Sequence, residues 1–218
     1  SDKVYDGGLS ASVDLSSVIK TGLVAGDVVT LSSTGSFSDK NVGVGKTVAF
    51  SNAFAGSDAG NYEITGQVSG TASITRKTLS ISGLQALDKV YDGDISANVD
   101  LSSVVKDGLV AGDEVDIVST GTFSDQMVGQ GKEVVFSNDY SGADAGNYDI
   151  SARSSGLASI IRKVLTISGI RALDREYDGS DAVQLDLSDS LVTGLIPNDD
   201  VSFVSTGIFS GKSAGKNK

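Results

Sequence analysis

The chain has 218 residues, contains neither histidine nor cysteine, and carries a formal net charge of −11 at pH 7. It therefore lacks the usual general base, the thiol nucleophile and most ligands for zinc, copper, haem and iron–sulfur clusters. We expect no enzyme, no catalytic residue, no metal site and no resident cofactor. The acidic balance disfavours nucleic acid, which is bound through Lys and Arg, and the apolar runs are too short for membrane insertion.

In chain order, alternating apolar and polar residues predict a succession of short strands. In the middle of the chain we expect strands at residues 78–81, 89–91, 96–101, 114–118, 121–124, 133–137, 147–151 and 157–161. Val115 and Ile117, for example, alternate with Glu114 and Asp116, which leaves the strand one apolar face. Residues 102–110 are expected to form a short helical turn. Together with 27 glycines and a single proline, this pattern indicates an all-β fold.

The chain repeats itself with a period of 86 residues. The string Lys-Val-Tyr-Asp-Gly at residues 3–7 returns at 89–93, and Arg-Glu-Tyr-Asp-Gly follows at 175–179. A second string, Asp-Ala-Gly-Asn-Tyr, occurs at 58–62 and 144–148. The motif residues are Tyr5, Asp6, Gly7, Tyr91, Asp92, Gly93, Tyr177, Asp178 and Gly179 in the first string, and Asp58, Gly60, Tyr62, Asp144, Gly146 and Tyr148 in the second.

We expect three units from this period: residues 1–76, a first repeat without its initial strand; residues 77–162, a complete repeat; and residues 163–218, the N-terminal half of a third. Neither seam contains a Pro/Gly-rich linker, so the units should be stiffly coupled. Because the chain opens at Ser1 without Met, we expect a piece of a longer or processed protein.

Each complete unit is expected to be an immunoglobulin-like β-sandwich, since 86 residues and about seven strands suit that fold. The spacing Asp144-x-Gly146-x-Tyr148-x-Ile150 is that of a tyrosine corner. Ile150 would then fill the core where antibody domains have their second cysteine, and the Tyr148 hydroxyl would bind the backbone of the preceding corner. A β-grasp unit with a short helix is the alternative fold.

Several strings suggest binding sites, but a structural interpretation is preferred for each. An Asp-Gly pair directly after a strand is expected to form a tight turn, and calcium binding is the alternative. Asp58, Asp139 and Asp144 lie in acidic corner loops where calcium between domains is the alternative. The Gly-x-Gly-Lys strings at 43–46 and 129–132 precede strands, which indicates hairpins and not phosphate loops. Tyr5, Tyr91 and Tyr177 are expected to pack in or near a core, with a sugar-stacking platform as the alternative.

These strings together resemble the YDG repeat, a relative of the mostly-β glycine-rich repeats of bacterial haemagglutinin-like surface adhesins. The resemblance implies structural spacer repeats in a long secreted or surface-anchored protein of a Gram-negative bacterium. The implied partners are neighbouring repeats of the same chain, other copies of the chain in a fibre, and surface glycans or proteins. The alternative function is a glycan- or protein-binding module, for which the divergent loop at residues 197–200 is the candidate.

Overall fold

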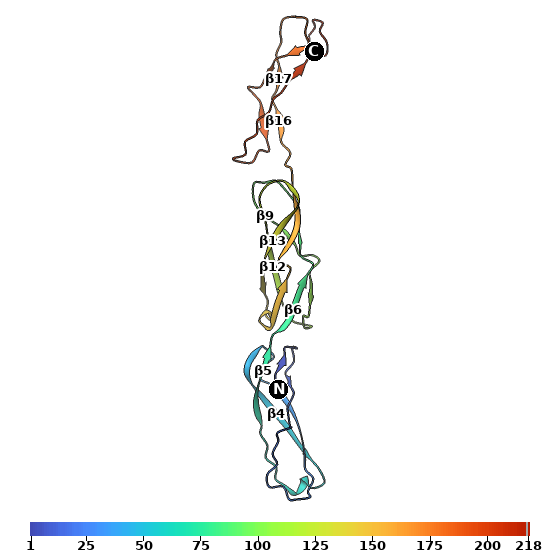
Figure 1. Ribbon diagram of the computed structural model, residues 1–218, viewed down its shortest axis with the longest axis vertical. Coiled ribbons are helices and arrows are strands. Elements are labelled where there is room, and N and C mark those ends of the chain that lie inside the picture. Colours follow the sequence, from blue (N-terminus) through green and yellow to red (C-terminus); the bar gives the residue numbers. More distant parts are fainter. Residues whose placement is uncertain (217) are drawn as a thin grey trace.

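The computed structural model describes residues 1–216 and residue 218. This part of the chain is all-β, as the alternation predicts, and its helical segments are two 3-10 turns, η1 (Ala59–Asn61) and η2 (Ala145–Asn147). Figure 1 shows three groups of strands standing end to end along the long axis, from the blue N-terminal group to the red C-terminal group. The molecule is therefore elongated, with its repeats in a row.

Two five-stranded sheets of the same topology form the first two groups. Their strand orders are β1-β5-β4-β3-β2 and β8-β15-β13-β12-β9, and each strand of the second sheet begins 86 residues after its counterpart in the first. The first sheet comprises β1 (Lys3–Val4), β2 (Ser10–Ala11), β3 (Thr30–Phe37), β4 (Gly43–Ala55) and β5 (Ser69–Thr75). The second comprises β8 (Lys89–Val90), β9 (Ser96–Ala97), β12 (Asp116–Phe123), β13 (Gly129–Ser141) and β15 (Ser155–Ile161).

The middle repeat has a second sheet centred on β6 (Lys77–Ser82). This strand pairs in parallel with β14 (Tyr148–Ala152) and antiparallel with β11 (Val105–Asp107). A short ladder of β7 (Gln85–Ala86) and β10 (Val99–Asp100) follows it. Leu79 and Ile81 of β6 are 0% and 3% exposed. In the numbering of the repeat, the counterpart of β6 in the first repeat would precede Ser1.

The third group consists of three two-stranded ladders. These are β16 (Thr166–Ser168) with β20 (Leu191–Thr193), β17 (Arg171–Ala172) with β19 (Leu185–Asp186), and β18 (Ala182–Val183) with β21 (Gly207–Ile208). Most of its side chains are half-buried or exposed, and all three residues of β16 are exposed. The third group is therefore much less covered than the middle repeat.

Three of the differences from the sequence prediction bear on how the strands join. The strands expected at 114–118 and 121–124 form one strand, β12, because Gly121 pairs with both neighbouring strands and does not end the ladder. A larger residue would not fit at this position, since a Cβ on Gly121 would lie 2.7 Å from Cγ1 of Val134. The strand expected at 96–101 is divided, since β9 joins β12 while β10 joins β7. Within 102–110, where one short helical turn was expected, residues 102–103 form a turn in which the N–H of Val104 donates to the carbonyl of Leu101 at 3.2 Å, and residues 105–107 form strand β11 against β6.

One cluster of buried side chains runs through the first two repeats. From the first repeat it contains Tyr5, Phe37, Val48, Ala72 and Ile74, and from the middle repeat Leu79, Ile81, Leu84, Ala97, Val115, Phe123, Val134, Phe136, Tyr148, Ala158 and Ile160. Tyr5 and Tyr148 carry the cluster from one repeat into the next. The boundary between the repeats is therefore packed like part of the core.

Candidate functional site at the junction between repeats

The tyrosine of the first Tyr-Asp-Gly string lies at the boundary between two repeats. Tyr5 directly follows β1, and its N–H donates to the carbonyl of Thr75 at 2.9 Å, which fixes its backbone against β5. Its side chain is 1% exposed. The ring meets that of Tyr148 edge to face, with centroids 5.5 Å apart and planes at 76°. Because Tyr148 belongs to the middle repeat, this aromatic contact crosses the junction.

A buried carboxylate binds both tyrosines. The Tyr5 hydroxyl donates to Oδ2 of Asp113 at 2.8 Å, and the Tyr148 hydroxyl donates to the same oxygen at 2.5 Å. The Tyr148 hydroxyl also accepts from the N–H of Val110 at 3.0 Å. The Asp113 side chain is 3% exposed. A charged group of the middle repeat is thus held by one tyrosine of its own repeat and one of the preceding repeat.

Lys40 supplies the opposite charge from the first repeat. Its Nζ lies 3.1 Å from Oδ1 of Asp113 and 2.8 Å from Oδ1 of Asp144. Beside it, Oδ1 of Asn147 accepts from the N–H of Val42 at 3.0 Å. The Asp-Ala-Gly-Asn-Tyr string of the middle repeat therefore faces the preceding repeat. Asp144, a candidate calcium ligand on sequence grounds, is paired with an ammonium group here, and no group of three acidic residues that could hold a metal occurs within the described residues.

The charges at the junction stabilise one another. Burial by itself would raise the pKa of Asp113, but hydrogen bonds from Tyr148 and Tyr5 and the ammonium of Lys40 outweigh it and hold that pKa below its usual value. Burial and the bond to Asp113 raise the pKa of Tyr148 to about 12. The pKa of Lys40 is raised by its bonds to Asp144 and Asp113. At neutral pH the junction therefore contains a carboxylate, protonated phenols and an ammonium group.

The equivalent tyrosines show how burial depends on the next repeat. Tyr5 is 1% exposed, whereas Tyr177, at the same position of the third string, is 70% exposed. Tyr91 is half-buried, and its hydroxyl donates to Oδ1 of Asp199 at 2.9 Å, which repeats the bond between Tyr5 and Asp113 at the second junction. In both pairs the partners are 108 residues apart. The tyrosine of the string is therefore a contact to the following repeat.

The second string behaves in the same way. Tyr148 is 4% exposed, but Tyr62, its counterpart in the first repeat, is half-buried. Within its own repeat, the Tyr62 hydroxyl donates to Asp27 at 2.6 Å and accepts from the N–H of Val24 at 3.0 Å. The bonds inside a repeat are thus present in both copies, while burial of the ring comes with a preceding repeat.

The Asp-Gly pair after each tyrosine shapes the turn that approaches the next repeat. Oδ1 of Asp6 accepts from the N–H of Gly8 at 2.8 Å and from Nζ of Lys3 at 2.6 Å. Gly7 has φ = +77°, and a Cβ on it would lie 2.9 Å from Cγ1 of Val110 in the middle repeat. This glycine is required both by its backbone angle and by the close approach.

The remaining Asp-Gly pairs follow the same pattern. Oδ1 of Asp92 accepts from the N–H of Asp94 at 3.0 Å, and Oδ1 of Asp178 accepts from the N–H of Ser180 at 2.8 Å. Gly93 and Gly179 have φ of +78° and +80°. Gly93 also faces the following repeat, since a Cβ there would lie 3.0 Å from Cγ2 of Ile196, whereas one at Gly179 would have nothing within 4 Å.

Sequence reasoning singled out the two strings but not their partners. Asp113 belongs to a Gly-Asp pair that recurs at 26–27 and 112–113, and this recurrence is the signal that could have found it. The Tyr148 hydroxyl was expected to bind the backbone of the preceding corner; it accepts from the N–H of Val110, 38 residues earlier, and donates to the side chain of Asp113. Asp58 accepts from the N–H of Val28 at 2.8 Å, and Asp139 lies within β13. Gly60 and Gly146 lie in η1 and η2.

Comparison with known proteins finds one family. The family model of the YDG domain matches residues 1–70, 75–155 and 161–218. No curated protein and no solved structure matches the chain. In the part of the chain that the structure describes, no helix has the length and apolar character needed to cross a membrane.

Proposed function

This chain belongs to the YDG domain family over nearly all of its length, and from that premise we propose that its repeats form a stiff structural spacer in a long, surface-anchored bacterial adhesin. The junction is the observation that supports the proposal. A spacer must transmit its direction from one repeat to the next, and a boundary packed as tightly as a core resists bending. At this boundary Tyr5, Tyr148 and Asp113 are almost fully buried.

The connection between the first two repeats also supports stiffness. β5 ends at Thr75 and β6 begins at Lys77, so Arg76 alone connects the two strands. Nε of Arg76 donates to the carbonyl of Gly146 at 3.2 Å, and its guanidinium lies 3.7 Å from Asp149. One residue between two strands allows little hinge motion, and here that residue also contacts the next repeat.

We further propose that the complete unit is an immunoglobulin-like sandwich of 86 residues, with seams at 76–77 and 162–163. Two observations favour it. The middle repeat has two sheets, one of five strands and one of three, with buried residues contributed by both. The strand bounds of the first two five-stranded sheets differ by the same 86 residues throughout. Between β13 and β15, which both belong to the five-stranded sheet, β14 pairs with β6 in the other sheet, and an experimental structure of the unit would test this crossing first.

We also propose that the chain has no catalytic activity and works outside the cell. The groups with displaced pKa values at the junction bind one another, as expected for structural ion pairs. A net charge of −11 keeps elongated molecules apart in solution through mutual repulsion.

Small-angle X-ray scattering tests the spacer directly. The unmodified chain should scatter as a straight rod, and Tyr5→Ala, which removes the ring between the repeats, should give a more flexible particle with a broader range of dimensions. Tyr177→Ala, which changes the exposed tyrosine of the third string, should leave the scattering unchanged. A flexible, beads-like profile for the unmodified chain would refute a stiff spacer.

A further inference from the structure

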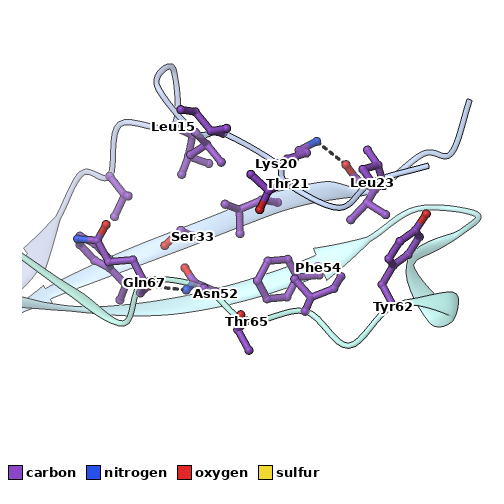
Figure 2. Close-up of a pocket in the computed structure, with 18 of the residues that line it drawn as sticks. Leu15, Lys20, Thr21, Leu23, Ser33, Asn52, Phe54, Tyr62, Thr65 and Gln67 are labelled. Carbon is purple, nitrogen blue, oxygen red and sulfur yellow. Dashed lines mark hydrogen bonds between the residues drawn. The ribbon is translucent and has the colours of Figure 1, made fainter. Parts of the chain in front are cut away.

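Each five-stranded sheet has an inner and an outer face. Figure 2 shows Ser33, Asn52 and Phe54 on the inner side of β3 and β4, where all three line a pocket of the first repeat. Successive side chains of a strand point to opposite sides of the sheet. The residues that alternate with these three, Ser32 and Ala53 among them, therefore belong to the outer face, and both are exposed.

The first and middle repeats share their core positions but differ on their outer faces. Five core positions carry the same side chain 86 residues apart: Phe37 and Phe123, Val48 and Val134, Phe50 and Phe136, Ala72 and Ala158, Ile74 and Ile160. Five outer positions on the same strands carry different ones: Ser32 and Val118, Thr47 and Glu133, Ala49 and Val135, Ala53 and Asp139, Thr71 and Leu157. Since the first repeat forms the same sheet with small and polar side chains there, the fold does not require the apolar and acidic residues of the middle repeat.

These five outer residues of the middle repeat lie together, and we call them the outer patch. In the ladders, Val118 pairs with Asp139, and Leu157 pairs with Glu133. Val135 lies between the two carboxylates on β13, which runs beside β12 in the middle group of strands (Figure 1). Cross-strand partners point to the same side of a sheet. Val118, Val135 and Leu157 are 60%, 57% and 67% exposed, so the outer patch combines three exposed aliphatic side chains with two carboxylates.

The aliphatic side chains of the outer patch indicate contact with a protein. Apolar side chains gathered on a surface mark sites of protein interaction, because a partner that covers them removes their contact with water. The outer patch contains no aromatic ring of the kind on which a sugar ring stacks. A protein therefore fits this surface better than a glycan does.

The charges of the outer patch indicate the chemistry of that protein. Neither Glu133 nor Asp139 forms an ion pair within the described residues. Residues 77–162 contain 13 acidic and 6 basic side chains, whereas residues 1–76 contain 7 and 5. A second copy of the chain would bring the same negative charge to the patch, which disfavours self-association there. Complementary charge on the partner means lysine or arginine.

We propose that the outer patch docks a protein segment that places apolar side chains between two lysines or arginines. Glu133 and Asp139 are six residues apart on β13, which corresponds to about 20 Å along a strand. An extended partner with basic residues six positions apart spans the same distance and presents two apolar side chains between them on the same face. The middle repeat thereby has a lateral contact in addition to its junctions with the neighbouring repeats.

Nuclear magnetic resonance of the whole chain tests the proposal with a defined probe. The probe is the synthetic peptide Lys-Thr-Val-Thr-Ile-Thr-Lys, whose Val and Ile lie on the same face as its two lysines when it is extended. Amide signals of the outer patch should shift during titration, while those of Ser32, Ala49 and Thr71 in the first repeat should not. The same peptide with Glu in place of both lysines should cause no shift. Because these spectra detect even millimolar Kd values, the absence of localised shifts would overturn the proposal.

Two substitutions separate the apolar and the charged contributions. Leu157→Thr and Glu133→Thr introduce small polar residues of the kind that the first repeat carries at these exposed positions, so both variants should fold. Each should weaken peptide binding by about tenfold or more, the first through lost apolar contact and the second through lost charge attraction. Val105→Thr is the matched control, because Val105 is 57% exposed in β11 of the other sheet, and this change should leave binding unaltered.

Transfer of the outer patch to the first repeat is the most demanding test. A chain that carries five substitutions should bind a second peptide there: Ser32→Val, Thr47→Glu, Ala49→Val, Ala53→Asp and Thr71→Leu. Shifts spread evenly over both repeats, or unchanged binding by Leu157→Thr, would show general attraction to an acidic chain and refute a specific site. A sedimentation mass that rises with concentration for the unmodified chain but not for Leu157→Thr would also refute it, because a second copy would then cover the patch. The spacer proposal is separate: Tyr5→Ala should leave peptide binding unchanged.

Discussion

The bond between Tyr5 and Asp113 allows the coupling of two repeats to be measured. Tyr5→Phe keeps the buried ring against Tyr148 and removes only the hydroxyl that donates to Asp113 at 2.8 Å. A hydrogen bond to a charged partner contributes about 1.5 to 3 kcal/mol. Asp113 retains Tyr148 and Lys40 as partners, so we expect a loss at the lower end, about 1.5 kcal/mol in the free energy of unfolding.

A double-mutant cycle isolates this bond from the rest of the junction. Asp113→Ala alone should cost about 3 to 5 kcal/mol, because it leaves the ammonium of Lys40 and two phenols without their common partner. In that background Tyr5→Phe should cost almost nothing, which gives a coupling energy of about 1.5 kcal/mol. Urea unfolding followed by tyrosine fluorescence measures it, since the chain has six tyrosines and no tryptophan.

Tyr177→Phe is the matched control, because this tyrosine has the same motif position and is 70% exposed. Its hydroxyl should contribute nothing measurable, in either background. If Tyr5→Phe costs the same with and without Asp113, the hydroxyl acts inside the first repeat and the argument for a coupled junction fails.

Three further predictions concern pH, the turn and the central strand. As pH falls below about 4 the junction should loosen, because the pKa of Asp113 is lowered in the folded chain, so its contribution to stability is lost as the carboxylate becomes protonated. As pH rises from about 10 towards 12 the junction should also loosen, because the pKa of Tyr148 is raised in the folded chain and its contribution is lost as the phenol ionises. Small-angle scattering at each pH should record both changes. Gly7→Ala should destabilise by about 1 to 3 kcal/mol more than Gly179→Ala in urea unfolding, since both have positive φ but only the first meets the next repeat. Leu79→Ala should lower the free energy of unfolding by about 2 to 5 kcal/mol in the same measurement, because Leu79 is fully buried. Leu165→Ala, at the same place in the third repeat, should cost much less, because Leu165 is only half-buried.

The all-β fold and the positions of most strands could be predicted from the sequence. Alternation shows which side chains of a strand are apolar: Val115 and Ile117 were expected on one apolar face, and Val115 is 1% exposed while Ile117 packs, partly buried, against the core. The short strands β9 and β10 could not be separated, because one alternating run feeds two different sheets. Nor could Lys40 be assigned to the site: nothing local distinguishes it from other exposed lysines.

What the sequence determined by itself is the repeat, since a closely similar pattern 86 residues later favours the same local strands and turns. What only the tertiary structure decided is which surfaces the repeats share. Tyr5 and Tyr177 stand in equivalent strings, yet one is buried and the other exposed, because burial depends on a repeat that begins far along the chain. The bond from Tyr5 spans 108 residues, and local pattern carries no information about a partner at that distance. The packing of one repeat against the next therefore decides which copy of the string lies at a buried junction.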